Sequence, residues 1–213
     1  MTFSKQDLRA FLQMWRRIKA TGNGENMFYV LKRAYNERHR RYHDAGHIRQ
    51  CLEDFGPARD MMREPLSVEL AIWFHDAVLV TGASDNESRS AELAQEMLWA
   101  GGVPDKVAVR VPALIMATKH DEKLSPRDPD AIMLVDIDLS PLGAHPKLFD
   151  DNAQRIRREM NMSNKEFFRK QALFFKKLFE RQNIYGTDLF HDKYEKQARR
   201  NIERFAWRAG VAI

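Results

Sequence analysis

Helical periodicity dominates the pattern of apolar and polar positions along this chain. In the first segment, a helix start signal at residues 4–7 precedes apolar residues that recur every three or four positions, at Leu8, Phe11, Leu12, Trp15 and Ile18. The same spacing predicts a second helix around residues 28–35 and a third over about residues 42–55. Residues 68–78 are strongly apolar, which predicts a helix that is buried on most sides.

Capping and breaking residues place the helix ends in the middle of the chain. Ser84 and Glu87 have the spacing of a capping box, and the glycines at 101–102 should end the helix that this box opens. Pro112 lies inside the following apolar segment, where proline predicts a kink or a break.

The last third of the chain continues the helical pattern. Residues 131–139 alone could form a strand, but their helical neighbours favour a short buried helix. Further helices are expected over residues 163–179, after a second capping-box match, and over residues 194–208. With no repeat or clear linker, the pattern predicts an all-α fold, a single-domain helical bundle over residues 1–213.

Length and composition narrow the class of protein. A chain of 213 residues with 44% hydrophobic residues can form one good-sized core. No apolar run approaches the ~20 residues of a membrane span, and residues 1–7 lack a signal-peptide pattern, so we expect a cytoplasmic protein with no membrane contact. The single cysteine, Cys51, excludes an intrachain disulfide and an all-thiolate metal site, so imidazole and carboxylate ligands are expected.

Excess positive charge is a property of the C-terminal part. Residues 151–213 hold 15 Lys and Arg against 8 Asp and Glu, which leaves 20 against 22 in residues 1–150. Helix-period apolar residues are interleaved with this charge, so a solvated helix face is the simplest interpretation; a positive rim that attracts a phosphorylated substrate is the sharper one. Nucleic-acid binding is disfavoured because no compact basic block or aromatic platform accompanies the charge.

Histidines and aspartates carry the candidate chemistry. His43 and His47 are four residues apart in a segment expected to be helical, so both imidazoles can point to one centre. The adjacent pair His75 and Asp76 then offers a nitrogen and an oxygen donor just after a buried segment. Asp136 adds a later carboxylate, although Asp138 competes with it and either aspartate could instead cap a helix.

These donors match a catalytic metal site. His47, His75, Asp76 and Asp136 would supply a mixed nitrogen and oxygen ligand set, which suits Mn, Mg, Fe, Co, Ni or Zn without choosing among these divalent ions. Such an ion lowers the pKa of a bound water and polarises a phosphoryl oxygen. His43 could stand just outside the ligands and protonate the leaving oxygen as a general acid.

The order of these residues resembles the HD superfamily of metal-dependent phosphohydrolases, whose pattern is a histidine, a His-Asp doublet and a distant aspartate. The chain is similar in more detail to a bacterial subgroup of predicted HD phosphohydrolases, through residues 42–47, 73–76, 85–91, 118–120 and 136–140. The first of these segments is also similar to that of cyclic-nucleotide phosphodiesterases, which implies that His43 is the acid and His47 a ligand. Two departures are Asp44 in place of the usual Asn and an element at residues 118–120 that is one residue shorter than usual.

The resemblance implies an HD-type helical domain with its metal-site core at about residues 42–140 and a basic helical part at about residues 146–210. It also implies hydrolysis of a phosphoester in a nucleotide or small phosphorylated metabolite, with a mononuclear centre preferred. His43 and Asp76 are the expected catalytic residues.

Four further residues are candidates for contacts around the metal or with the substrate. Asn86 and Glu87 could cap a helix or orient a ligand, while Lys119 and His120 are candidates for a phosphate contact, with His120 also a candidate for a second metal. Substrate specificity is expected to depend on the loops at residues 79–84 and 121–130. Two alternative functions stay open: a nonenzymatic nucleotide or phosphate sensor that uses the same site, and an iron-dependent HD-type oxygenase, which the missing second-metal histidines disfavour.

Overall fold

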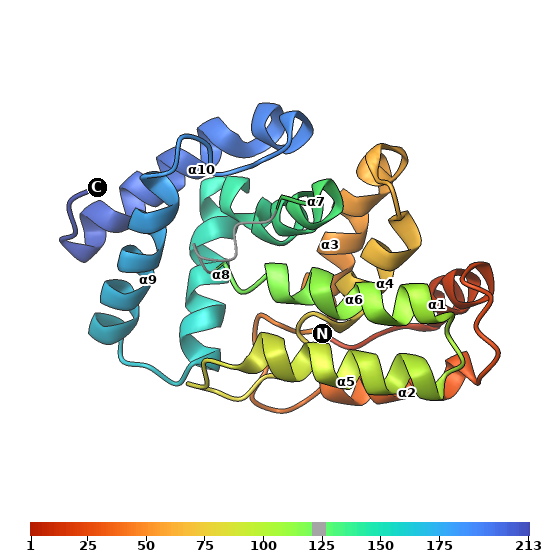
Figure 1. Cartoon of the computed structure of the whole chain (residues 1–213). Coiled ribbons are helices and arrows are strands. Elements are labelled where there is room, and N and C mark those ends of the chain that lie inside the picture. Colours follow the sequence, from red (N-terminus) through yellow and green to blue (C-terminus); the bar gives the residue numbers. More distant parts are fainter. Residues whose placement is uncertain (121–126) are drawn as a thin grey trace. The chain divides into compact units, whose positions relative to one another are not determined.

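The computed structural model describes residues 1–120 and 127–213, and it is all-α throughout these ranges (Figure 1). Part of the loop expected at residues 121–130 lies outside the described residues. The helices assigned within the described ranges are α1 (Lys5–Arg17), α2 (Gly24–Ala34), α3 (Ala45–Ala58), α4 (Pro65–Phe74), α5 (Asn86–Ala100), α6 (Asp105–Ala117), α7 (Pro129–Leu139), α8 (Pro146–Glu159), α9 (Asn164–Phe179) and α10 (Asp188–Ala209). The predicted fold class is confirmed, and residues 131–139 are helical as expected.

The chain divides into two compact units, Met1–Leu134 and Val135–Ile213, and each is described by itself. In the first unit, α5 and α6 lie side by side (Figure 1), α4 packs on α6, and α3 packs on α4. In the second unit, α10 packs on α9 and on a short 3₁₀ helix, η3 (Ser140–Gly143). The single domain expected over residues 1–213 stays a prediction.

The capping signals were informative at some helix ends and misleading at others. The start signal at residues 4–7 is a capping box formed by Ser4 and Asp7, and Ser163 accepts a hydrogen bond from the third residue of α9. The box expected at Ser84 does not form, because α5 starts two residues later and its N-cap residue makes no side-chain capping bond. Pro112 does not interrupt the helix, since α6 continues through it, and the alternative of a kink stays a prediction.

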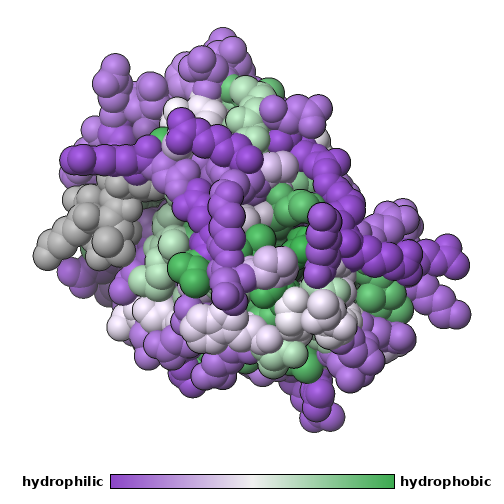
Figure 2. All heavy atoms as spheres, turned by 45° about the vertical axis from the view of Figure 1, so that its right-hand side comes forward, coloured by the Kyte–Doolittle hydropathy of each residue, from purple (hydrophilic) through white to green (hydrophobic). Residues whose placement is uncertain are grey.

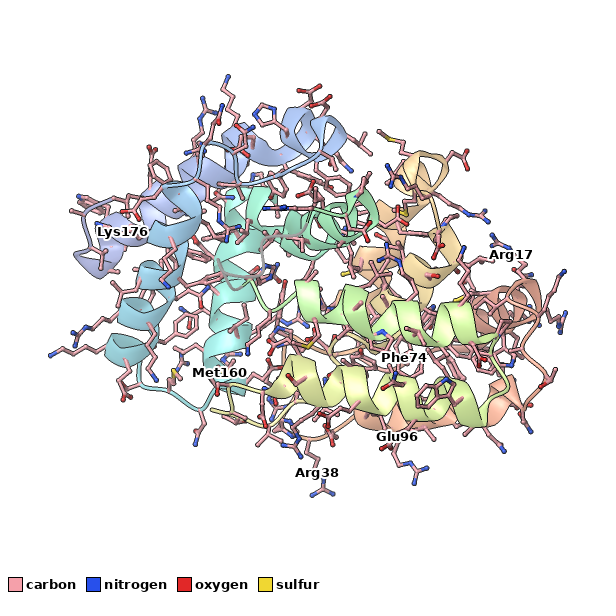
Figure 3. All side chains as sticks on the ribbon, viewed as in Figure 1. Arg17, Arg38, Phe74, Glu96, Met160 and Lys176 are labelled. Carbon is pink, nitrogen blue, oxygen red and sulfur yellow. The ribbon has the colours of Figure 1, made fainter. Side chains whose placement is uncertain are left out.

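The core of the first unit surrounds α4. Every residue from Leu70 to Phe74 is at most 1% exposed, as expected for a helix buried on most sides. The Trp73 ring contacts Phe3, Phe11 and Phe28, with ring centroids 5.2, 5.2 and 6.1 Å away. In Figure 3, the labelled Phe74 lies among the helices, whereas the Arg38 and Glu96 side chains point outward. This packing fixes α4 and therefore the two residues that follow it.

One face of the molecule is mainly polar. Figure 2 shows a face on which hydrophilic side chains predominate, with hydrophobic ones gathered in smaller groups between them. Among the described helices, none combines the length and the apolar character that crossing a membrane requires.

Candidate metal centre

His47 and Cys51 reach the candidate centre from one side of α3. The helix begins at Ala45 because the Asp44 side chain accepts a hydrogen bond from the backbone N–H of Gly46, at 2.7 Å, and acts as the N-cap. The predicted start near residue 42 was therefore too early, and His43 lies just before the helix rather than on it. His47 and Cys51 are one helical turn apart, and both are buried.

His75 and Asp76 reach the centre from the end of α4. His75 is the C-cap residue of this helix, and its Nδ1 lies 3.0 Å from the carbonyl oxygen of Ile72. Since a carbonyl can only accept, this bond requires the proton on Nδ1, which leaves a lone pair on Nε2 in the neutral ring. Orientation of a ligand histidine through its other nitrogen is the usual arrangement in metal sites.

Three donor atoms from these two segments meet at short distances. His47 Nε2 lies 3.2 Å from His75 Nε2, and Asp76 Oδ2 lies 3.1 Å from His75 Nε2 and 3.5 Å from His47 Nε2. Ligands that bind one ion at about 2.0–2.2 Å, at right or tetrahedral angles, are separated by about 2.9–3.6 Å. The three separations therefore match those within a single metal coordination sphere.

The Asp76 oxygen in this group has no hydrogen bond of normal geometry among the described residues, and it is buried. Its approach to His75 is a close ionic contact rather than a directed hydrogen bond. Burial opposes ionisation, but the nearby charges of His75, His43 and His47 together hold the pKa of Asp76 well below its usual range. A buried carboxylate oxygen needs a positive charge beside it, from a protonated imidazole or from a bound cation. The donor set therefore fits a metal ion.

Cys51 adds a sulfur donor that the sequence interpretation left out. Its Sγ lies 3.7 Å from His47 Nε2, and donor atoms of His47, Cys51 and His75 all lie within 4.8 Å of one another. A thiol therefore lies within reach of the centre, beside the expected imidazole and carboxylate donors. The four-residue step from His47 to Cys51 was the available signal, because it places the thiol on the same helix face.

His43 lies beside this group. Its ring is half-buried, 5.7 Å between centroids from the His47 ring and 4.9 Å from the Tyr42 ring, with both pairs edge to face. Its position next to a ligand histidine is compatible with the expected role as a proton donor.

Asp136, the fourth predicted ligand, makes hydrogen bonds within the second unit. Its carboxylate accepts from the backbone N–H groups of Gly186 and Thr187, at 2.8 and 2.7 Å, and from the Thr187 hydroxyl at 2.6 Å. Burial raises the pKa of Asp136, although these hydrogen bonds act in the opposite direction. The carboxylate thus satisfies two backbone donors in the turn just before α10, which is neither ligation nor the helix capping that the sequence left open. Its role as a ligand stays a prediction.

Asn86 stabilises the chain segment that leaves the His-Asp doublet. Its side chain accepts from the N–H of Val80 at 2.8 Å and donates to the carbonyl of the same residue at 3.1 Å. Ser90, one turn later, makes the same pair of bonds with Val78, at 3.0 and 3.3 Å. The motif at residues 85–91 therefore anchors the backbone that follows Asp76, a role that neither capping nor substrate contact had suggested.

The remaining candidates lie at helix ends. Glu87 is half-buried in the first turn of α5. Lys119 and His120 follow Thr118, the C-cap residue of α6, and His120 adopts a left-handed backbone conformation with φ of 54°. Their proposed contacts with ligands or substrate stay predictions.

Arg40 is the main residue near the centre that the sequence did not single out. Its buried guanidinium donates to the carbonyl oxygens of His43, Asp76 and Ala77, at 3.0, 2.7 and 3.0 Å. An arginine among neighbouring arginines gives no sequence signal of burial, and its partners are up to 37 positions away.

Comparison of the chain with protein-family models, with curated protein sequences and with solved structures gives no match.

Proposed function

We propose that this protein is a metal-dependent phosphohydrolase that acts on a nucleotide or another small phosphorylated metabolite. The observation that carries the proposal is the convergence of His47 Nε2, His75 Nε2 and Asp76 Oδ2 at mutual distances of 3.1–3.5 Å, with the carboxylate oxygen buried and lacking a hydrogen bond among the described residues. The order of these residues along the chain, which resembles the HD superfamily, supports phosphoester hydrolysis as the reaction.

His47, His75 and Asp76 would hold the ion, with Cys51 close enough to be a further donor. When bound, a divalent ion supplies an activated water and offsets negative charge on a phosphoryl oxygen. The protein's own part is to keep these donors deprotonated and oriented. The Ile72 carbonyl orients His75 by accepting a hydrogen bond from its Nδ1, and the neighbouring imidazoles keep Asp76 ionised.

His43 would act as the general acid. Its imidazole lies next to His47 on the segment before α3, and it contributes to the low pKa of Asp76. A proton held on this ring could be delivered to the oxygen of the departing group, as the resemblance to cyclic-nucleotide phosphodiesterases implies.

The distant aspartate of the pattern has two candidates, Asp136 and Asp138. Both oxygens of Asp136 accept strong hydrogen bonds from residues 186–187, whereas Asp138 is half-buried two positions later on α7. The resemblance assigns the role to Asp136, and metal affinity measured in variants of both residues tests this assignment. Loss of metal affinity in Asp136→Asn, with affinity retained in Asp138→Ala, would support Asp136; the reverse pattern would favour Asp138.

A metal analysis followed by a substrate screen tests the function. The purified protein is stripped and reconstituted separately with Mn²⁺, Mg²⁺, Fe²⁺, Co²⁺, Ni²⁺ and Zn²⁺, then assayed for phosphate release from nucleotides and phosphorylated metabolites. We expect turnover with at least one ion and none in Asp76→Ala. His43→Ala should bind the ion normally while the rate falls by about 10²–10⁴-fold.

Three results would contradict the proposal. Full metal content and turnover in Asp76→Ala would remove the centre from the mechanism. Tight nucleotide binding without turnover with any ion would favour the sensor, and a strictly oxygen-dependent activity on an unphosphorylated compound would favour the oxygenase.

A further inference from the structure

Arg40 is buried at a position where a charged side chain needs several partners. Its side chain has no exposed surface, and its Nε donates to a carboxylate oxygen of Glu37 at 3.0 Å. The terminal nitrogens donate to three backbone carbonyls, so the planar guanidinium is bonded along its whole edge. Such a side chain is neither a metal ligand nor available to a substrate.

The three carbonyls belong to the two segments that carry the candidate ligands. One is that of His43, immediately before the cap of α3, and the others are those of Asp76 and Ala77, just after α4. A single rigid group thereby joins two backbones that lie about 35 residues apart in sequence. The distance between His47 and the His75–Asp76 pair depends on the same two backbones.

Tyr35 adds a second connection between the segment before α3 and the end of α4. Its ring lies 5.0 Å from the Arg40 guanidinium carbon, and its hydroxyl donates to the carbonyl of Trp73 at 3.0 Å. Burial, aided by the charge of Asp76, raises the pKa of Tyr35 well above its ordinary value, so the hydroxyl keeps its proton. The α4 terminus is therefore held by two residues of the segment that precedes α3.

We infer that Arg40 is a positioning residue for the metal centre, which sets the separation of the ligand segments by bonding to the carbonyls of His43, Asp76 and Ala77. The inference rests on the metal site proposed above. Lysine cannot replace this function, because a single ammonium group lacks the planar fork that reaches three carbonyls at once.

Arg49 provides a matched control. It lies on α3, two residues after His47, and it also joins distant segments by donating to the Asp7 carboxylate, at 2.9–3.2 Å, and to the carbonyl of Thr2 at 2.6 Å. Its partners lie at the N-terminal end of the chain and not in the segment of His75. A variant at Arg49 therefore loses a similar number of bonds without releasing the ligand segments from each other.

The test measures metal affinity and stability in the same four variants, Arg40→Lys, Arg40→Gln, Arg49→Lys and Arg49→Gln, in the full chain. Dissociation constants for Zn²⁺ and Co²⁺ come from competition with a chromophoric chelator, and stability of the metal-free protein comes from urea unfolding. We expect both Arg40 variants to raise the dissociation constant by about 10–100-fold, the range typical of residues that orient metal ligands. The Arg49 variants should stay within about twofold of the unaltered protein, and the visible spectrum of bound Co²⁺ should change only in the Arg40 variants.

Tyr35→Phe keeps the inference testable if the Arg40 variants do not fold. It retains the ring and removes only the bond to the Trp73 carbonyl, so we expect a smaller loss of affinity, about threefold to tenfold. Unchanged affinity in folded Arg40 variants would overturn the inference, as would an equal loss in the Arg49 variants. If the unaltered protein binds no metal, the proposed function itself fails.

Discussion

Two aspartates, one in each unit, have carboxylate oxygens hidden from solvent but differ in what those oxygens contact. Asp136 accepts three hydrogen bonds of 2.6–2.8 Å, two of them from the backbone. Asp76 has an oxygen that is equally hidden from solvent but faces two imidazole nitrogens and lacks a hydrogen bond among the described residues. Protein groups supply the hydrogen bonds that the Asp136 carboxylate needs. The Asp76 oxygen lacks such bonds within the described residues and needs a cation beside it.

The difference teaches that burial and residue type alone do not identify a ligand. Both aspartates fit the same family pattern in sequence, and both are surrounded by polar groups. What separates them is the kind of partner: N–H and O–H donors bond to Asp136 with normal geometry, whereas Asp76 faces two imidazole nitrogens. The pKa values follow this balance, because burial raises that of Asp136 while the histidine charges lower that of Asp76.

The largest effect expected is on metal binding by Asp76→Ala. Removal of this ligand should weaken metal binding by about 100-fold or more, and the metal-free protein should lose less stability than it does in Asp136→Ala, because no hydrogen bond to Oδ2 from the described residues is broken. Elemental analysis and urea unfolding of the metal-free protein measure the two quantities. A variant that unfolds readily without metal would show that Asp76 is a structural residue like Asp136.

Asp136→Ala should give the opposite result. Two backbone N–H groups and the Thr187 hydroxyl lose their acceptor, so we expect the free energy of unfolding to fall by about 2–4 kcal/mol. Asp136→Asn keeps one acceptor oxygen and should lose less. Chemical denaturation of both variants checks the order, and an unfolding free energy unchanged by Asp136→Ala would contradict the structural role.

Cys51→Ser tests whether the thiol is a ligand in the centre that contains Asp76. If the thiol is a ligand, Co²⁺ bound to the unaltered protein should show a sulfur-to-metal charge-transfer band in the near ultraviolet that the variant lacks. Affinity for the thiophilic ion Zn²⁺ should fall by about tenfold, whereas affinity for Mg²⁺ should not change. Absence of the band in the unaltered protein would leave the centre with nitrogen and oxygen donors only.

The smallest effect concerns Asp7, a partly exposed carboxylate with a fixed partner. Burial raises its pKa, but the hydrogen bonds from Arg49 and Ser4 outweigh this and lower the pKa below 3.8. A lowered pKa in the folded state contributes stability above the unfolded value, and this contribution disappears as the pH falls through the folded value. Asp7→Asn should therefore cost about 1 kcal/mol at pH 7 and less below pH 4, in unfolding curves measured at both pH values. An equal cost at the two pH values would contradict the ionic contribution.

Much of the fold could be predicted because local signals agree with it. The apolar period of α1, the continuous apolar run of α4 and the Ser4 capping box each correspond to an element of the structure. The Ser84 box and the Pro112 break failed because such signals report a local preference, which packing of α5 on α6 can override.

The site was predictable only where its residues are neighbours in sequence or share a helix face. His75 and Asp76 are adjacent, and His47 could be matched to them through a known order of residues. Arg40 could not be found in this way, because its partners are backbone carbonyls, which leave no trace in residue type. The bonds of Asp136 likewise depend on a turn some 50 positions away.

The buried indole of Trp73 gives the protein an internal optical reporter. It lies two residues before His75, is 1% exposed, and its Nε1 has no hydrogen-bond partner among the described residues, so its emission should be blue-shifted. Trp99 and Trp207 are exposed, so iodide in the solvent can quench their emission selectively. Ions such as Co²⁺ or Ni²⁺ accept energy from a nearby excited indole. The arrival of the ion could therefore be followed in real time by fluorescence, without a label.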